Sequence, residues 1–337
     1  MEKVRLKIEK LIYGGSGTGF LEGLPVFVPM TVPGDEIECG IVKRHRGYAE
    51  GVMLKMLGPS PNRALPKCEH FGRCGGCQWQ HMDYASQLLW KQLIVEEQLK
   101  RIGKFEAPNV LPSIPSPKIW GYRSRIKLHK DGQGRAGFYA GGTHDLIEVK
   151  ECLIADVEAI KRTPSFFTQI NQEQNEVLRT EVAAAVKGLG AETVLELYCG
   201  NGNLTFPLAK VVKNMTAADS SRSAIDNAVK EARKNRVKNI NFICQPSKAV
   251  MNHLARFHNK FDLLVVDPPR NGCKEIIEGI KRLRPEAIVY ISCNPSTLAR
   301  DLKDMGAFGY VLESSQPIDM FPQTFHIETI TKMILKQ

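Results

Sequence analysis

Short stretches with strand-like patterns, separated by turns, open the chain. Val4–Leu11 alternates between apolar and polar residues, a glycine-rich turn follows at Tyr13–Gly19, Pro25–Pro29 is a short apolar run, and a turn at Pro33–Asp35 leads into Glu36–Arg44. Alternation interrupted by Gly and Pro is typical of β-strands. We therefore expect a small barrel of about five strands in residues 1–58. The linker Gly58–Asn62 ends it, because its two prolines disfavour both a helix and a central strand.

Residues 59–165 combine one helix with short strands. In Tyr84–Ile102 apolar residues recur at helical spacing, which predicts an amphipathic helix. Between Tyr122 and Leu128 cationic residues alternate with small or apolar ones, the pattern of a strand with one basic face. Phe138–Tyr139 and Leu146–Val149 are predicted to be further antiparallel strands.

The pattern changes at about Phe166, where strands begin to alternate with helices. The predicted helices are Val177–Val186 and Ser223–Arg236, and the predicted strands are Thr193–Tyr198, Met215–Ala218, Phe261–Val266 and Ala287–Ser292. This alternation predicts right-handed crossovers and a parallel sheet. We therefore expect an α/β domain with a doubly wound sheet in residues 166–337.

The overall composition excludes several classes of protein. With 43% hydrophobic and 24% charged residues among 337, the chain is not a fibre, a disordered tail or a small disulfide scaffold. No stretch reaches the roughly 18 consecutive apolar residues of a membrane helix, and the N-terminus leads into no apolar signal core. We expect a cytoplasmic protein without a membrane partner, whose nine cysteines are reduced.

The positive charge is unevenly distributed. Residues 1–150 hold 22 basic and 15 acidic residues, so most of the net charge of +10 lies in this part of the chain. Such an excess indicates contact with a polyanion, although a solvated basic surface is the alternative. Cations and aromatics mix between Lys118 and Tyr139, where Asp131 is the only acid up to Arg135. A charged strand face is usually just solvated, but the clustering of cations with aromatics is also typical of surfaces that contact nucleic acid.

A glycine-rich turn follows the first predicted strand of the α/β domain. Tyr198-Cys199-Gly200-Asn201-Gly202-Asn203 lets the backbone approach a nucleoside closely, and Asp219, after the next strand, is placed to accept hydrogen bonds from ribose hydroxyls. Thr205 stands where the dinucleotide fingerprint has its third glycine. The turn therefore favours S-adenosylmethionine over a dinucleotide.

Two later strands are followed by residues with reactive side chains. Asp267-Pro268-Pro269-Arg270 follows one strand and Cys293 follows another, so both are expected at the same sheet edge. A lone cysteine after a strand is more often a buried small hydrophobe than a nucleophile. The cofactor turn, the acidic turn and the late carboxylate of Glu328 favour the second interpretation for Cys293.

These motifs together closely resemble the RNA 5-methyluridine methyltransferases, over nearly the whole chain. The resemblance rests on the cofactor motif Leu195–Pro207, the acidic turn Asp267–Arg270, the segment Ser292–Asp301 and the segment Phe321–Thr329. It implies that Cys293 is the nucleophile and Glu328 the general base. It further implies cofactor or site contacts at Gln169, Tyr198, Gly200, Asn203, Asp219 and Asp267. The related 5-methylcytosine enzymes carry a cysteine in the acidic turn, which this chain lacks.

Three cysteines are closely spaced in a glycine-rich loop. Cys68-x5-Cys74-x2-Cys77 leaves one ligand position open, and from spacing alone zinc and an iron–sulfur cluster are nearly equal candidates. Cys152 completes a set of four that resembles the 4Fe-4S subgroup of the family. The resemblance therefore implies a structural 4Fe-4S cluster, with zinc as the alternative. Cys39, Cys199, Cys244 and Cys273 are predicted to be structural.

The first 58 residues resemble the TRAM domain, a small OB-like RNA-binding barrel. Gly14–Gly19, Val26–Pro29 and Pro33–Asp35 carry this match, and Lys43–Arg46 adds a basic tip. We expect three parts: a TRAM barrel at 1–58, a cluster-bearing RNA-binding region at 59–165 and a Rossmann-like methyltransferase at 166–337. We expect the chain to be a monomer. Its expected function is methylation of carbon-5 of a uridine in 23S ribosomal RNA. The alternatives are a transfer RNA uridine and a non-catalytic RNA-binding protein.

Overall fold

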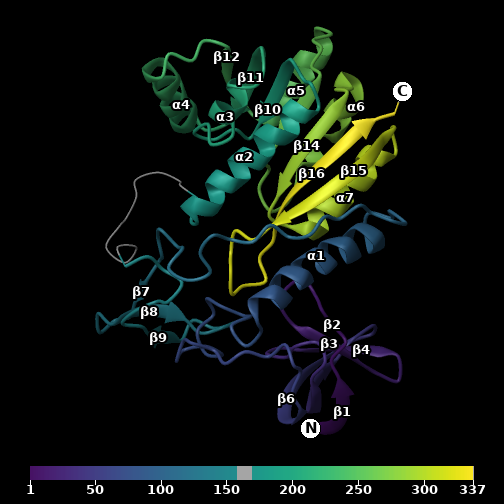
Figure 1. The fold of residues 1–337 in the computed structure, drawn as a ribbon, viewed down its shortest axis with the longest axis vertical. Helices are drawn as coiled ribbons and strands as arrows, with labels where there is room; N and C mark the ends of the chain where they lie inside the picture. Colours follow the sequence, from purple (N-terminus) through teal and green to yellow (C-terminus); the bar gives the residue numbers. More distant parts are fainter. Residues whose placement is uncertain (158–168, 337) are drawn as a thin grey trace. The chain divides into compact units, whose positions relative to one another are not determined.

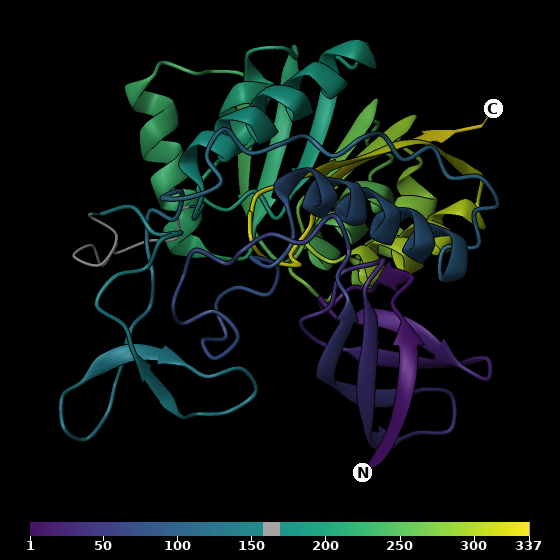
Figure 2. The same cartoon turned by 60° about the horizontal axis from the view of Figure 1, so that its bottom comes forward.

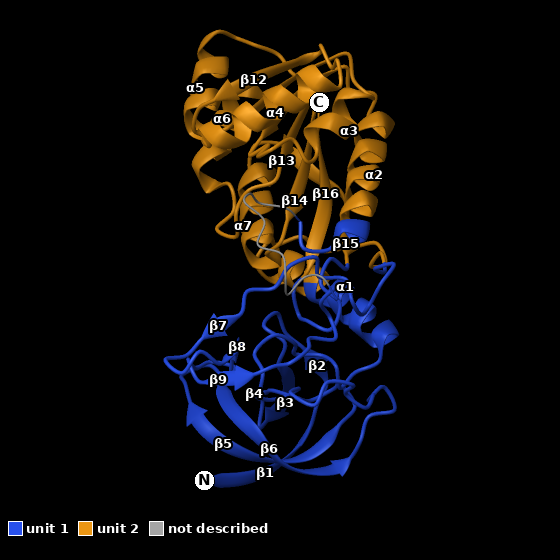
Figure 3. Cartoon of the chain, turned by 90° about the vertical axis from the view of Figure 1, so that its left-hand side faces the viewer, with its two compact units in different colours: residues 1–94, 115–174, 319–326 blue, residues 95–114, 175–318, 327–337 orange. Residues whose placement is uncertain are grey.

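The computed structural model describes residues 1–157 and 169–336. The boundary expected at 165/166 and residues Phe166–Thr168 lie outside this part. The chain forms two compact units, each assembled from separate segments (Figure 3). Unit 1 consists of residues 1–94, 115–174 and 319–326, and unit 2 of residues 95–114, 175–318 and 327–337.

The N-terminal part of unit 1 is a six-stranded sheet with the order β1-β5-β6-β4-β3-β2. Its strands are β1 (Glu2–Lys7), β2 (Lys10–Leu11), β3 (Gly17–Leu21), β4 (Leu24–Val28), β5 (Glu36–Arg44) and β6 (Ala49–Gly58). Because β1 pairs with β5 and also packs against β3, the sheet closes on a core that includes Ile8, Val28 and Ile37. The predicted strand Val4–Leu11 is divided into β1 and β2, so the structure has six strands where about five were expected.

The remainder of unit 1 contains a small three-stranded sheet, with the order β7-β8-β9. It is formed by β7 (His129–Lys130), β8 (Ala136–Tyr139) and β9 (Leu146–Glu148). The strand predicted between Tyr122 and Leu128 is absent. The Arg123 amide donates to Ile154 and the Ser124 amide to Ile170, so two different segments share this backbone and no ladder forms.

The predicted helix at Tyr84–Ile102 is confirmed as α1 (Tyr84–Arg101). Its buried residues Ile94, Val95 and Leu99 recur on one side of the helix, as the spacing indicated. The first part of α1 belongs to unit 1 and the part from Val95 onwards belongs to unit 2.

Unit 2 is built on a seven-stranded sheet with the order β12-β11-β10-β13-β14-β16-β15. The parallel strands are β10 (Thr193–Leu197), β11 (Asn214–Asp219), β12 (Ile240–Cys244), β13 (Leu263–Val266) and β14 (Ala287–Ser292), and the antiparallel pair is β15 (Tyr310–Ile318) and β16 (Glu328–Leu335). The order reverses between β10 and β13. In open α/β sheets this switch point places ligand sites at the carboxyl ends of the strands.

Helices cover this sheet, as Figures 1 and 2 show. They are α2 (Gln172–Gly188), α3 (Thr205–Ala209), α4 (Arg222–Lys234), α5 (Ser247–Arg256), α6 (Ile277–Leu283) and α7 (Pro295–Gly306), with the short 3-10 helix η1 (Lys274–Ile276) before α6. Helix α4 packs on β11 and β12, whereas α5, α6 and α7 pack successively against one another. The strands between them are almost fully apolar and buried, as expected for a parallel sheet.

Among the described residues, no helix has both the length and the apolar character needed to span a membrane.

Candidate active site

Cys293 and Glu328 lie side by side at one edge of the unit 2 sheet. Cys293 directly follows β14 and Glu328 begins β16, and these strands pair so that Ser292 faces Thr329. The next residue along β14 and the preceding residue of β16 are therefore neighbours. The Thr329 hydroxyl donates to the Ser292 carbonyl at 3.2 Å, which closes this end of the ladder.

The acidic turn reaches the same place from β13, the other neighbour of β14. Asp267 follows the last residue of β13, and Arg270 lies three residues further on. The Arg270 carbonyl accepts hydrogen bonds from the side-chain amide of Asn294 and from the Thr297 hydroxyl, both at 3.1 Å. This ties the acidic turn to the start of α7, immediately after Cys293.

The three titratable groups of this edge share one electrostatic environment. Burial, followed by the charge of Glu328, raises the pKa of Cys293 to about 11, and Arg270 opposes the shift. Burial raises the pKa of Asp267 to about 7. Burial and the neighbouring Asp267 raise the pKa of Glu328 well above its usual value. The site thus holds a cysteine beside carboxyl groups with a high affinity for protons.

Asp301, on α7, holds the end of the acidic turn in place. Its buried carboxylate accepts hydrogen bonds from the Tyr290 hydroxyl at 2.8 Å and from the Cys273 amide at 2.7 Å, and it pairs with Arg300 at 2.7 Å. Gly272 has a φ of +80°, and a Cβ there would lie 2.3 Å from the Asp301 carboxylate. The turn therefore requires glycine at this position.

The predicted cofactor turn follows β10 as expected. Tyr198 has a φ of +62°, which is uncommon for a residue other than glycine, and its hydroxyl donates to Glu275 at 3.0 Å. Gly200 also has a positive φ, and its amide donates to the Asp219 carboxylate at 2.9 Å. Asp219 thus holds the turn closed at the end of β11, and its carboxylate keeps further lone pairs for a ligand.

The remaining two predicted cofactor contacts are Asn203 and Gln169. Asn203 forms a reciprocal amide pair with Asn175 on α2, with both hydrogen bonds at 2.9 Å. Gln169 belongs to unit 1, where its backbone carbonyl accepts from the Ser124 hydroxyl. The structure therefore brings Tyr198, Gly200, Asn203, Asp219 and Asp267 together within unit 2, and Gln169 lies in the other unit.

Glu196, the next-to-last residue of β10, is a carboxyl group that the sequence analysis did not single out. It is 2% exposed, and its Oε2 has no hydrogen-bond partner among the described residues. Burial raises its pKa to about 8. An acidic residue inside an otherwise apolar strand, just before a glycine turn, was the signal available in the sequence.

The four cysteines of the predicted cluster lie near one another in unit 1. Cys68 raises the pKa of the Cys74 thiol, Cys74 and Cys152 raise that of Cys77, and Cys74 raises that of Cys152, while burial is the largest cause in each case. The Gly75 amide donates to the Tyr139 carbonyl, which fastens the cysteine loop to β8.

The positive charge of Arg123 opposes the rise in thiol pKa: it lowers the pKa of Cys74, Cys77 and Cys152. Arg123 was expected on an exposed basic strand face, and it lies instead beside the thiols. Within the described residues, no group of three or more His, Cys, Asp or Glu side chains is arranged to hold a metal ion.

Comparison with known proteins identifies the family. The sequence model described as tRNA (Uracil-5-)-methyltransferase matches residues 144–336, more than half of the chain. The chain belongs to this family. The TRAM domain model matches residues 2–54, which confirms the expected nature of the N-terminal barrel.

Relatives and a solved structure agree with this assignment. An uncharacterized RNA methyltransferase of Aquifex aeolicus is 31% identical over 422 aligned positions, which cover 99% of each chain. One from Halalkalibacterium halodurans is 29% identical and covers 99% of this chain and 97% of the relative. The crystal structure of a Pyrococcus abyssi tRNA (uracil-54, C5)-methyltransferase with S-adenosyl-L-homocysteine matches 98% of this chain and 100% of its own, with a TM-score of 0.71 and 25% identity.

These matches establish the general activity. The chain is an enzyme of an S-adenosylmethionine-dependent RNA uracil-5-methyltransferase family, with an RNA-binding TRAM domain at its N-terminus. The expectation of a methyltransferase fold is confirmed, and the alternative of a non-catalytic RNA-binding protein is wrong.

Proposed function

We propose that the chain methylates carbon-5 of a uridine in structured RNA through a covalent adduct with Cys293. The observation that carries this proposal is the convergence of Cys293, Glu328 and Asp267 at the edge where β13, β14 and β16 meet. A nucleophile beside a strongly basic carboxylate is the pair that this substitution requires.

Cys293 begins the reaction by adding to carbon-6 of the uracil ring. The thiol gives up its proton to the ionised fraction of Asp267 or to water, the sulfur–carbon bond forms, and the ring electrons move to carbon-5 and the adjacent carbonyl as an enolate. Arg270 favours this step because its charge lowers the pKa of the thiol. When bound, S-adenosylmethionine supplies the electrophilic methyl group that carbon-5 attacks.

Glu328 completes the reaction by removing the proton that remains on carbon-5. The electrons of that carbon–hydrogen bond restore the ring double bond, and the Cys293 thiolate leaves carbon-6. A carboxylate whose pKa is raised by burial is a better base once ionised than an exposed glutamate. Asp267 shares this role or orients the groups, since its pKa of about 7 leaves it partly ionised at neutral pH.

We propose that Gln169, Tyr198, Gly200, Asn203, Asp219 and Asp267 contact the cofactor or line its site. The hydrogen bond from Gly200 to Asp219 supports this for the turn, since it fixes the backbone that would face the nucleoside. The buried Glu196 lies two residues before Tyr198 and joins the proposed set. Replacing Asp219 by Ala is expected to raise the dissociation constant for S-adenosylmethionine about tenfold, the loss of one charge-assisted hydrogen bond.

The four cysteines lie near one another in unit 1, since their charges raise one another's pKa. Four neighbouring thiolates are the ligand set of both a structural zinc ion and a 4Fe-4S cluster. The resemblance of Cys68-x5-Cys74-x2-Cys77 with Cys152 to the iron–sulfur subgroup favours the cluster.

We therefore propose that Cys68, Cys74, Cys77 and Cys152 hold a structural 4Fe-4S cluster, with Arg123 offsetting part of its negative charge. Anaerobic purification followed by a visible absorption spectrum and metal analysis tests this. We expect a brown protein with about four irons per chain, and a colourless protein with stoichiometric zinc would contradict the proposal. The matched control is Cys39→Ser, which removes a thiol in the TRAM barrel and is expected to leave the colour unchanged.

We propose 23S ribosomal RNA as the substrate, with the chain acting as a monomer in the cytoplasm. The cysteine region, which resembles the iron–sulfur subgroup, supports ribosomal RNA. The Pyrococcus abyssi relative, a transfer RNA enzyme, supports the alternative. Both substrates require the same residues in unit 2.

One experiment tests the reaction and the substrate together. Protein and labelled S-adenosylmethionine are incubated with ribosomal RNA or transfer RNA from cells lacking the protein, and the RNA is digested to nucleosides. We expect labelled 5-methyluridine from the ribosomal fraction only, and none with Cys293→Ala. Label confined to transfer RNA would overturn the choice of substrate, and the absence of 5-methyluridine from both fractions would overturn the proposed reaction.

A further inference from the structure

A cavity of about 720 Å³ opens in unit 2, beside the acidic turn and helices α5 and α6. Pro269, Asn271 and Gly272 line it from the acidic turn, so the cavity begins within a few residues of Asp267 and Arg270. It also reaches α7 at Arg300, seven positions after Cys293. None of the residues predicted to contact the cofactor lines this cavity.

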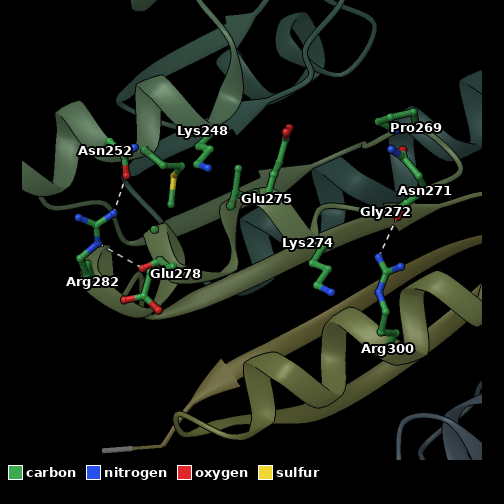
Figure 4. A pocket seen from close by; sticks show the side chains of 13 residues that line it. Lys248, Asn252, Pro269, Asn271, Gly272, Lys274, Glu275, Glu278, Arg282 and Arg300 are labelled. Carbon is green, nitrogen blue, oxygen red and sulfur yellow. Dashed lines mark hydrogen bonds between the residues drawn. The ribbon is translucent and has the colours of Figure 1, made fainter.

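Most of the charged side chains in the lining are cationic. Four basic side chains contribute to it, and Figure 4 shows Arg282 at one end, Arg300 near the other, and Lys248 and Lys274 between them. Two carboxylates, those of Glu275 and Glu278, belong to the same lining, so the positive charges outnumber the negative ones.

The two arginines are fixed by their contacts. Arg282 donates to the Asn252 side-chain oxygen at 2.5 Å and to the Glu278 carbonyl, both uncharged acceptors (Figure 4). Arg300 donates to the Asn271 carbonyl at 2.8 Å and pairs with the buried Asp301. Arg282 thus keeps its full charge while its side chain is already ordered, which lowers the entropic cost of binding an anion.

The two lysines have no such contacts. Within the described part of the chain, neither Lys248 nor Lys274 has a hydrogen bond or ion pair to its amino group, and both side chains are exposed. Glu275 lies next to Lys274 in the chain, but its carboxylate accepts a hydrogen bond from Tyr198. The ordered guanidinium group of Arg282, which keeps its charge, and the two unpaired ammonium groups present three cations to a series of phosphates.

We propose that this cavity binds backbone phosphates of the substrate RNA, on the strand that flanks the nucleotide held at Cys293. The proposal rests on the proposed function, because it takes RNA at Cys293 as its starting point. A target uridine must be turned out of its stack, and the neighbouring backbone then needs cations that hold it in the distorted path. S-adenosylmethionine carries a sulfonium cation, so a cationic cavity does not suit it.

The test compares two double variants with the unchanged protein. K248Q/K274Q removes the unpaired cations of the cavity. K187Q/K210Q is the matched control, because these exposed lysines line a separate cavity of unit 2, of about 520 Å³, beside residues 190–192 that precede β10. RNA dissociation constants are measured over a series of salt concentrations, and S-adenosylmethionine binding is measured in parallel by calorimetry.

We expect K248Q/K274Q to weaken RNA binding about tenfold at low salt and to reduce the slope of log K against log salt by about 1.4, or 0.7 for each lost contact to a single strand. Cofactor affinity should not change, and the control should match the unchanged protein. Equal slopes for both variants would overturn the proposal. So would loss of cofactor affinity with RNA affinity retained, since the cavity would then serve the cofactor.

The binding measurement also separates the two proposals. If the unchanged protein makes no 5-methyluridine on the RNA used, the proposed reaction fails, whereas the salt slopes still decide whether the cavity holds phosphates. Because Lys248 and Lys274 are exposed, we expect the melting temperature of the variant to be unchanged, so that weaker binding cannot be attributed to unfolding.

Discussion

Lys91 and Asp319 form an ion pair at 2.5 Å in which both side chains are completely buried. Lys91 lies on α1, and Asp319 begins the segment of unit 1 that leads to Glu328. The Lys91 ammonium also donates to the Phe321 carbonyl at 3.1 Å. The pair therefore fixes the start of segment 319–326 of unit 1, which precedes β16 in the chain.

We predict that Lys91→Met lowers the free energy of unfolding by about 3–5 kcal/mol, because it leaves the Asp319 carboxylate buried without a counter-charge. Denaturant titration measures this loss. K91M/D319L should recover most of it, and Lys100→Met, which breaks the exposed pair with Glu96 on the same helix, should cost less than about 1 kcal/mol. Similar losses for both lysine variants would show that burial of the pair is unimportant.

The reactivity of Cys293 should respond in opposite directions to its two charged neighbours. Because its pKa is about 11, alkylation by iodoacetamide should accelerate from pH 7 to pH 10. Arg270→Gln removes the charge that lowers this pKa, and the rate at a given pH should fall. Glu328→Gln removes a charge that raises it, and the rate should increase. Peptide mass spectrometry follows Cys293 separately from the other cysteines, and a shift in the same direction for both variants would contradict this picture.

Glu328→Gln should also stop the reaction after methyl transfer. Without a base for the carbon-5 proton, the bond between Cys293 and carbon-6 cannot break by elimination. We expect a protein–RNA complex that survives denaturing electrophoresis and requires S-adenosylmethionine for its methylated form. Cys293→Ala combined with Glu328→Gln is the control, and a complex that persists in this double variant would exclude Cys293 as the attachment point.

Asp301 is predicted to matter more than any one of its partners. Asp301→Asn leaves Arg300 without its counter-charge and turns an acceptor of the Cys273 amide into a poorer one, so we expect a loss of about 3 kcal/mol of unfolding free energy. Tyr290→Phe removes a single hydrogen bond and should cost about 1 kcal/mol. Equal losses in thermal or chemical unfolding would show that Asp301 acts through Tyr290 alone.

The buried carboxyl of Glu196 predicts the pH dependence of stability. Its pKa rises from 4.5 to about 8, so the folded protein retains a proton that the unfolded chain releases. The resulting stability is complete below pH 4.5 and is lost as the pH rises towards 8. Glu196→Gln should flatten the fall of melting temperature over this range, leaving the part of the slope that comes from the raised pKa values of Asp267 and Glu328. A slope unchanged by the substitution would show that Glu196 is ionised in the folded state.

The sequence predicted the sheet of unit 2 more successfully than the central region. Strands such as Ala287–Ser292 are continuous apolar runs bounded by turn residues, so their limits are visible in the pattern. Strand β16 was missed because its polar and apolar residues alternate irregularly, although it carries Glu328. The strand predicted after Tyr122 is absent for a different reason. Cationic and apolar residues do alternate there, but the backbone hydrogen-bond partners come from two distant segments, so no ladder forms.

The sequence analysis selected residues of the candidate site but could not give its electrostatics. The positions of Cys293 and Asp267 after predicted strands, together with the resemblance to the family, selected Cys293, Asp267 and Glu328, whose roles stay predictions. The role of Arg270 in the thiol pKa and the anchoring by Asp301 depend on the mutual positions of three strand ends, which no local pattern encodes. The sequence analysis did not select Glu196, because its significance comes from its burial, which depends on the tertiary structure.

Each of the two units is assembled from three separate segments of the chain, and this has a consequence for the synthesis of the protein. Neither unit corresponds to a contiguous stretch of codons, since residues 95–114, 175–318 and 327–337 must all be made before unit 2 is complete. A chain that stops after residue 326 lacks β16, which is hydrogen-bonded to both β14 and β15 and carries Glu328. A ribosome must therefore translate beyond residue 335 before this strand can join the sheet, and we expect fragments released earlier to be inactive.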